Sequence, residues 1–383
     1  MATSIKSIIK LFLKRIFYLL PIQKNKIVFV NYNFKGYGDN PKYIAEEIRR
    51  QGLPCKLIWL VQEDYNIPSY IKKVYLRGVT WYYELCTAGV IISNVKNQVF
   101  RYYIKKENQY YLQTWHGDFP LKFIEKEVEG TLSPNYVAAS KADSSVTNAI
   151  VSGNKQFSKI LKESFWLPKE CTVLEYGLPR NDIYFKDNGF RDKLKQKLGI
   201  SLNEKVLLYA PTFRNNMDMS YYNLDFERLR KFLCQIDNIS WTIIIRMHPN
   251  ISSKADLFQY NNNIIDGSAY PDQQELCVIS DYLITDYSSI MGDFLLMRKP
   301  VFLYVPDLER YSDKALDRGL REMYYHLPFS SSQNQEDLEA QVAIFDYEDY
   351  IIKAESFMSI YYNTFDDGRA SERVVEYLKN AVS

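Results

Sequence analysis

The sequence predicts an α/β protein with two domains, each built on a mainly parallel β-sheet. Short apolar runs rich in β-branched residues alternate with helical segments, and this order is typical of parallel sheets. The alternation begins again after a polar, charged stretch at residues 180–204. A length of 383 residues suits two domains of similar size, which we expect to face each other across a cleft.

The first domain is predicted from six apolar runs. Pro41 near the start and Gly52 at the end of one intervening segment favour a helix between the first two runs. The predicted strands of this half are KIVFVNY (26–32), KLIWLV (56–61), GVIISN (89–94), YYLQTWHG (110–117), YVAAS (136–140) and CTVLEYG (171–177).

The second domain is predicted from five further apolar runs, each leading into a loop. These are VLLYAPTFR (206–214), WTIIIRMHP (241–249), NIIDGS (263–268), DYLITDYSS (281–289) and PVFLYVPD (300–307). A last helix, ASERVVEYLKN (370–380), is expected to pack back on the first domain. The predicted division is a helix at 1–22, an N-terminal domain at 23–190, a C-terminal domain at 191–365 and the terminal helix at 366–383.

Residues 1–20 predict a basic amphipathic helix. Apolar residues recur at helical spacing, while Lys6, Lys10 and Lys14 follow the opposite side. The charges interrupt the run, so it falls short of the ~20 apolar residues that a membrane span needs. Such a helix is typical of attachment to an anionic membrane surface, and the alternative is a helix that packs on the protein itself.

The composition narrows the function classes. A net charge of +2 argues against a nucleic-acid-binding polycation, so we predict no nucleic-acid partner. Five dispersed cysteines without a CxxC pair argue against a disulfide framework or a zinc knuckle. We therefore expect a reducing, cytoplasmic compartment.

Polar residues gather just after the predicted strands, where open parallel sheets bind their ligands. Four such strand ends stand out, at Gln113–Gly117, Ala210–Arg214, Arg246–Pro249 and Thr285–Ser289. Each is a weak signal alone, and four together are a much stronger one.

Two of the three histidines lie at these strand ends. Histidine titrates near physiological pH, which suits proton transfer. Gly117 permits a tight turn after His116, and Pro249 fixes the loop after His248. We predict catalytic or phosphate-binding roles for both, against the alternative of a capping hydrogen bond. His326 is expected to be structural or to line a rim.

The Ser288–Ser289 pair precedes a helical stretch, where hydroxyls and backbone N–H groups favour an anion. Simple N-capping is the alternative. Arg214 and Arg246 are candidates to clamp phosphates, or else form ion pairs. Asp293, one turn into the helix, is a candidate partner for ribose hydroxyls, or a solvated carboxylate without a ligand.

Metal and dinucleotide motifs are missing from the sequence. There is no HExxH, no DxD and no acidic cluster with ligand spacing, so we predict neither an essential metal nor a cofactor. The pair Gly36 and Gly38 lacks the third glycine of a dinucleotide fingerprint, and its loop is predicted to line the cleft.

At these residues the sequence resembles the CDP-glycerol glycerophosphotransferase family of teichoic-acid primases and polymerases. The stretches that carry the resemblance are GYGDNPKYIAEEI (36–48), WHGDFPLK (115–122), APTFR (210–214), RMHP (246–249), ITDYSSIMGDF (284–294) and PVFLYVPDLERYSD (300–313). They span roughly residues 25–375, and the ordered set is highly specific. One departure is the pair Asp118–Phe119, where family members usually have a single residue between HG and PLK. It changes the register between His116 and Lys122, and its carboxylate is expected either to orient His116 or to repel a phosphorylated acceptor.

The resemblance implies a GT-B-like fold and transfer of glycerol phosphate, or ribitol phosphate, from a CDP-activated polyol with release of CMP. The acceptor would be a hydroxyl of a lipid-linked glycan or polyol-phosphate polymer at the cytoplasmic face of the membrane. His116 would be the general base and His248 would act at the pyrophosphate. The predicted donor and phosphate-binding residues are Thr212, Arg214, Arg246, Asp286, Ser288, Ser289 and Asp293. The predicted acceptor-side residues are Gly36, Gly117, Asp118 and Lys122.

Two other function classes stay open. A GT-B glycosyltransferase of the polysialyl or Kdo type would use a CMP-sugar donor. A non-catalytic scaffold would bind polymer at the membrane. The sequence does not separate glycerol from ribitol donors, or a primase from a polymerase, and it gives neither the acceptor's identity nor the oligomeric state.

Overall fold

The computed structural model describes residues 5–96, 100, 103–214, 218–247, 258–312 and 319–382. The chain divides into two compact units. Unit 1 contains Met1–His116, Glu125–Asp182 and Thr364–Ser383, and unit 2 contains Gly117–Ile124 and Ile183–Asn363. The chain therefore leaves unit 1 at Asp182 rather than at residue 190, and the short segment Gly117–Ile124 belongs to unit 2.

Unit 1 is built on a seven-stranded sheet of order β3-β2-β1-β4-β5-β6-β7, in which every pairing is parallel. Its central strands are buried on both faces, which explains their nearly continuous apolar sequences. The strands are β1 (Gln23–Val30), β2 (Lys56–Val61), β3 (Lys72–Tyr75), β4 (Ala88–Ser93), β5 (Tyr110–Gln113), β6 (Ala149–Ser152) and β7 (Thr172–Glu175).

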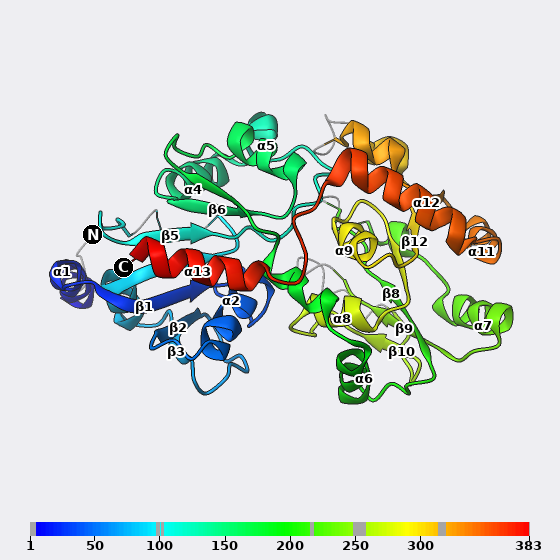
Figure 1. Cartoon of the computed structure of the whole chain (residues 1–383), viewed down its shortest axis with the longest axis horizontal. Coiled ribbons are helices and arrows are strands. Elements are labelled where there is room, and N and C mark those ends of the chain that lie inside the picture. Colours follow the sequence, from blue (N-terminus) through cyan, green and yellow to red (C-terminus); the bar gives the residue numbers. More distant parts are fainter. Residues whose placement is uncertain are drawn as a thin grey trace. The chain divides into compact units, whose positions relative to one another are not determined.

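Helices cover this sheet, and the last of them comes from the far end of the chain. Val374, Val375 and Leu378 of α13 join the same buried cluster as Ile44 and Ile48 of α2, and Figure 1 shows the red α13 beside α2. The helices of unit 1 are α1 (Ile5–Leu19), α2 (Asp39–Arg50), α3 (Thr80–Thr87), η2 (Glu125–Thr131), α4 (Pro134–Ser144), α5 (Lys155–Ser164), η3 (Pro179–Phe185, which crosses into unit 2) and α13 (Ala370–Val382).

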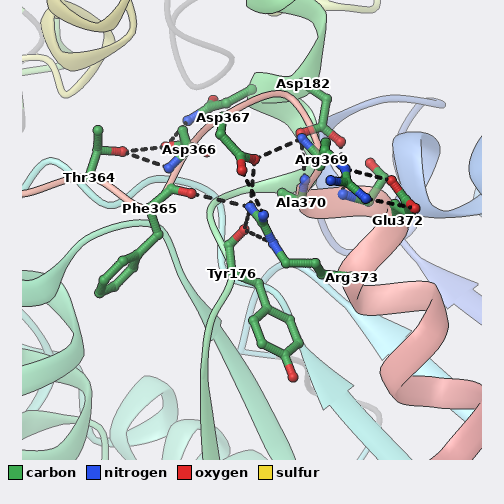
Figure 2. A network of polar contacts seen from close by, with 12 residues as sticks. Tyr176, Asp182, Thr364, Phe365, Asp366, Asp367, Arg369, Ala370, Glu372 and Arg373 are labelled. Atoms are coloured by element: carbon green, nitrogen blue, oxygen red, sulfur yellow. Dashed lines mark hydrogen bonds and ion pairs between the residues drawn. The ribbon is translucent and has the colours of Figure 1, made fainter.

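A polar network fastens the returning chain to unit 1 (Figure 2). The Asp182 carboxylate accepts hydrogen bonds from Ala370 N and Ser371 N, both at 2.8 Å, at the start of α13. Asp366 accepts from Leu178 N at 2.7 Å, and Arg373 donates to the Tyr176 carbonyl at 2.6 Å. Burial raises the pKa of Asp182, although the hydrogen bonds from Ser371 and Ala370 oppose this shift. The network explains why residues after Asn363 belong to unit 1.

Unit 2 has a six-stranded parallel sheet of order β10-β9-β8-β11-β12-β13. Its strands are β8 (Lys205–Tyr209), β9 (Trp241–Ile245), β10 (Ile264–Asp266), β11 (Tyr282–Thr285), β12 (Val301–Tyr304) and β13 (Ser330–Ser332). Its helices are α6 (Asn188–Lys197), η4 (Met219–Tyr222), α7 (Phe226–Asp237), α8 (Gln273–Ile279), α9 (Ile290–Leu296), α10 (Leu308–Ser312), η6 (Glu322–His326), α11 (Gln335–Ala343), α12 (Tyr347–Phe357) and the π-helix η7 (Met358–Tyr362).

The α/β class with two parallel sheets is confirmed, and one predicted strand is wrong. Residues 136–140 lie in α4 rather than in a strand. Ser133 caps this helix by accepting a hydrogen bond from Tyr136 N, and Pro134 occupies its first turn. These end signals, with two alanines in the segment, outweigh the short apolar run. The edge strands β3 (KKVY) and β13 (SSS) and the inner strand β6 (AIVS) were not predicted, and β3 and β13 lack the apolar run that marks the other strands.

The predicted N-terminal helix is present as α1, and part of it packs on the protein. Phe17 makes an edge contact with Tyr83 of α3, and the Lys14 ammonium lies 5.1 Å from the Trp81 ring centroid. Phe12, Ile16 and Leu19 are exposed by 63%, 39% and 83%. None of the helices in the described part of the chain is long and apolar enough to cross a membrane.

Candidate active site

His116 follows β5 of unit 1 and is oriented by a main-chain carbonyl. Its Nδ1 lies 2.8 Å from the Asn94 carbonyl oxygen, just beyond β4. A carbonyl only accepts, so the neutral ring carries its hydrogen on Nδ1 and its lone pair on Nε2. Trp115 has a φ of 52°, a left-handed conformation that non-glycine residues rarely adopt. A neutral His116 with its Nδ1 hydrogen directed at Asn94 would have the tautomer that a general base needs.

Asparagines tie the strand ends around His116 together. Asn94 accepts a hydrogen bond from Tyr32 N at 2.9 Å and donates to the Asn31 side chain at 3.0 Å. Asn40, at the start of α2, donates to the Trp115 carbonyl at 2.9 Å. Asn31, Asn40 and Asn94 are all at most 2% exposed. Three strand ends, those of β1, β4 and β5, are thus held as one rigid support.

The sequence analysis missed a second polar group beside His116. The Tyr32 hydroxyl donates to Asp39 at 2.8 Å, and Asp39 is 3.3 Å from Arg180 in a buried ion pair. The Tyr32 and His116 ring centroids are 5.8 Å apart. The polar character of the stretch NYNFKGYGDN was the available signal for this group.

Gly36 is a turn residue of this loop. Its φ of 68° favours glycine, and its carbonyl accepts a hydrogen bond from Trp59 Nε1 at 3.0 Å. Gly36 thus shapes the turn of this loop, and its place on the acceptor side stays a prediction.

In unit 2, Arg214 lies at the centre of a buried ionic cluster. Its Nε and Nη2 donate to the two Asp307 oxygens at 2.7 and 2.9 Å, and its Nη1 donates to Asp286 at 2.7 Å. Burial opposes its charge, but the carboxylates of Asp286 and Asp307 outweigh this and hold the pKa of Arg214 above its usual value. Arg214 is 3% exposed.

Asp286 connects this cluster to two strand ends. Its carboxylate accepts from Thr212 N at 2.8 Å, after β8, and from Tyr287 N, after β11. It is 2% exposed. Arg214 and Asp286 thus connect the loops that carry Thr212 and Ser288 through hydrogen bonds and ion pairs, and their predicted contact with phosphate stays a prediction.

Other predicted donor-side residues lie just after β8, β9 and β11. Ser288 and Ser289 are half-exposed at the start of α9. The buried Thr212 Oγ1 has no hydrogen-bond partner among the described residues. Arg246, after β9, donates to the carbonyls of Gly267 and Tyr270 at 2.7 and 2.8 Å. His248 lies outside the described residues.

Three predicted residues are more deeply built into unit 2 than expected. Asp293 is 4% exposed and accepts a hydrogen bond from Tyr184 at 2.9 Å. Asp118 is 3% exposed and accepts from Tyr362 at 2.9 Å. Lys122 donates to Tyr311 at 2.7 Å. The predicted place of Asp118 and Lys122 in the N-terminal domain is therefore wrong: Gly117–Ile124 is part of unit 2, where Lys122 also forms a bridge to Leu320.

His326 is the last residue of η6 in unit 2. The His326 ring stacks on Tyr361 with centroids 5.5 Å apart, and its side chain is 48% exposed.

Within the described ranges, no group of three or more His, Cys, Asp or Glu side chains is arranged to hold a metal ion.

Gly292 of α9 gives a stability prediction, because a Cβ there would lie 2.7 Å from the Phe119 ring. Phe119 is 5% exposed and packs on Phe357 and Tyr362. Alanine normally stabilises a helix interior by about 1 kcal/mol over glycine. We expect Gly292→Ala to destabilise the protein instead, by about 1–3 kcal/mol in urea unfolding, because the core is overpacked.

Two further variants control this prediction. Gly130→Ala, where a Cβ would meet nothing within 4 Å, should leave stability nearly unchanged. Phe119→Leu combined with Gly292→Ala should recover part of the loss. A Gly292→Ala protein more stable than the wild type would contradict the proposed contact.

The two parallel α/β sheets, with polar residues at their strand ends, define a GT-B-like protein. A structure of the wall teichoic acid polymerase TagF matches with a TM-score of 0.85 and 30% identity, covering 99% of this chain and 96% of that chain. A TagF variant soaked with CDPG matches with a TM-score of 0.83 and 31% identity, over 94% and 90% of the two chains.

A family model described as CDP-Glycerol:Poly(glycerophosphate) glycerophosphotransferase matches residues 12–380. The chain belongs to this family. The teichoic acid poly(glycerol phosphate) polymerase of Staphylococcus epidermidis is 34% identical over 79% of this chain, which spans only 42% of that protein. The teichoic acid glycerol-phosphate transferase of Staphylococcus aureus is 32% identical over 92% of both chains. Relatives named as ribitol-phosphate polymerases are 27% identical.

Proposed function

We propose that this protein transfers glycerol phosphate from CDP-glycerol to a hydroxyl of a teichoic-acid-type acceptor and releases CMP. The observation that carries the proposal is the orientation of His116 by the Asn94 carbonyl, at a strand end of a chain that belongs to this family. Glycerol is favoured over ribitol because the relatives named for glycerol phosphate are 34% and 32% identical, against 27% for those named for ribitol phosphate.

In the proposed reaction, His116 Nε2 accepts the proton of the acceptor hydroxyl. The acceptor oxygen attacks the glycerol-side phosphorus in line, a new P–O bond forms, and the bond to the CMP oxygen breaks. Ser288, Ser289 and Thr212 offer hydroxyl donors for the pyrophosphate, and negative charge moves onto CMP. Arg246 and His248 are assigned to the same side from their strand-end positions.

A donor panel tests this function. Purified protein is incubated with CDP-glycerol, CDP-ribitol or CMP-sialic acid and a polyol-phosphate acceptor, and CMP release and acceptor extension are measured. We expect both with CDP-glycerol. CMP release from CMP-sialic acid alone would indicate a glycosyltransferase, and no turnover of any donor would favour a polymer-binding scaffold.

We further propose peripheral attachment to the cytoplasmic face of the membrane through α1. Phe12, Ile16 and Leu19 recur at helical spacing and are exposed, and Arg15 beside them is exposed as well. Changing the three apolar residues to serine should weaken binding to phosphatidylglycerol vesicles by more than about tenfold in a sedimentation assay, because each would lose apolar burial.

A matched variant separates specific attachment from loss of general stickiness. Ile344, Ile352 and Ile360 of unit 2 are exposed by 74%, 71% and 57%. Their triple change to serine should leave vesicle binding unchanged. Equal loss in both variants would count against attachment through α1.

A further inference from the structure

Tyr32 lies in an unusual left-handed turn after β1. Tyr32, Asn33 and Phe34 have φ angles of 39°, 56° and 73° in succession. Non-glycine residues visit this region at a cost, usually one at a time, and they persist there only where their surroundings impose it. Strained backbone of this kind clusters at functional sites, where it fixes the position of a side chain.

Hydrogen bonds from neighbouring elements hold the turn in place. Asn94 Oδ1 accepts from Tyr32 N at 2.9 Å, and Gln62 binds the turn twice, through Asn33 O at 2.9 Å and Phe34 O at 3.0 Å. Lys35 N donates to Asn31 O at 2.8 Å and closes it. The strain is therefore compensated by residues that follow β1, β2 and β4.

The turn presents the Tyr32 ring to His116. Tyr32 is 40% exposed, yet its hydroxyl donates to Asp39, which is 4% exposed. Asp39 is itself held by the backbone N of Asn40 at 2.8 Å and by Arg180. The two rings are 5.8 Å apart at their centroids and inclined by 58°. Tyr32 is thus fixed through both its backbone and its hydroxyl, and Asn94 contacts Tyr32 and His116 alike.

We propose that Tyr32 binds the acceptor, by packing its ring against the carbon chain of the polyol or sugar whose hydroxyl reaches His116. This inference rests on the proposed function, because it takes His116 as the base on the acceptor side. A fixed aromatic ring offers apolar area with little entropy left to lose on binding. The Asp39 contact holds the ring, so the hydroxyl itself is not needed for contact with the acceptor.

The test compares three variants with a soluble glycerol-phosphate oligomer as acceptor and CDP-glycerol as donor. Tyr32→Ala should raise the KM for the oligomer about tenfold and leave the KM for CDP-glycerol unchanged. Tyr32→Phe keeps the ring but loses the hydrogen bond to Asp39 that helps to fix it, so its affinity for the oligomer should lie between those of the wild type and Tyr32→Ala. Tyr75→Ala is the matched control, since Tyr75 is 39% exposed, donates to Asp64 at 2.9 Å and lies on the edge strand β3.

Binding of the oligomer alone, measured by calorimetry, separates this inference from the proposed function. Weaker binding by Tyr32→Ala with an unchanged melting temperature supports the acceptor contact, whatever activity His116→Ala retains. An unchanged oligomer affinity, or a parallel rise in the KM for CDP-glycerol, would overturn the inference. Full activity of His116→Ala would instead remove the general base from the proposed function.

Discussion

His116→Ala is expected to lower the rate of glycerol-phosphate transfer by at least ~10²–10⁴-fold, the usual contribution of a general base. The fixed Nδ1 contact with Asn94 leaves Nε2 as the proton acceptor, and alanine removes it. Binding of CDP-glycerol, measured by calorimetry, should persist. The rate is measured as CMP release with saturating acceptor.

His326→Ala is the control for this variant. His326 lies in η6 of unit 2, and its half-exposed side chain pairs with Glu322 and stacks on Tyr361. Turnover should be close to that of the wild type. The outcome that would remove His116 from the mechanism is near-normal transfer by His116→Ala, and loss of CDP-glycerol binding would move it to the donor side.

The fold class was predictable because both sheets are parallel and buried, so their strands are apolar runs that stand out in the sequence. The order of these runs gave the two-sheet arrangement and placed His116, Thr212 and Ser288 at strand ends. The edge strands β3 (KKVY) and β13 (SSS) lack such an apolar run, so the sequence did not mark them. Helix α4 shows the converse case, in which the cap at Ser133 outweighs an apolar run.

The roles of individual polar residues were harder to predict, because they depend on partners far along the chain. Arg214 was predicted as a phosphate ligand, and nothing in the sequence indicated that Asp307, 93 residues later, binds two of its nitrogens. Asp118 accepts a hydrogen bond from Tyr362, 244 residues later, a partner that the local sequence does not indicate. Tyr32 carries no motif of its own, and its place depends on Asn94 and Asp39.

Asp307→Ala is expected to be the most destabilising of the predicted substitutions. It would leave the Arg214 cation, 3% exposed, with Asp286 as its remaining carboxylate partner, and Tyr287 would lose its contact of 3.1 Å with Asp307. Removing one partner of a buried ion pair typically costs about 3–5 kcal/mol, because the remaining charge stays desolvated. Urea unfolding should show this loss, and affinity for CDP-glycerol should fall as the Thr212 and Ser288 loops loosen.

Arg228 provides a matched comparison within unit 2. It also binds two carboxylates, Glu336 and Glu339, each at 2.7 Å, but its side chain is 45% exposed and that of Glu336 is 68% exposed. Glu336→Ala should therefore cause a much smaller loss of stability than Asp307→Ala, since solvent screens the pair. The ion pairs of Arg214 and Arg228 have similar N–O distances, so a larger loss of stability in Asp307→Ala than in Glu336→Ala would be caused by burial. Equal, small losses from both variants would mean that the Arg214 cluster does not hold the donor-side loops in place.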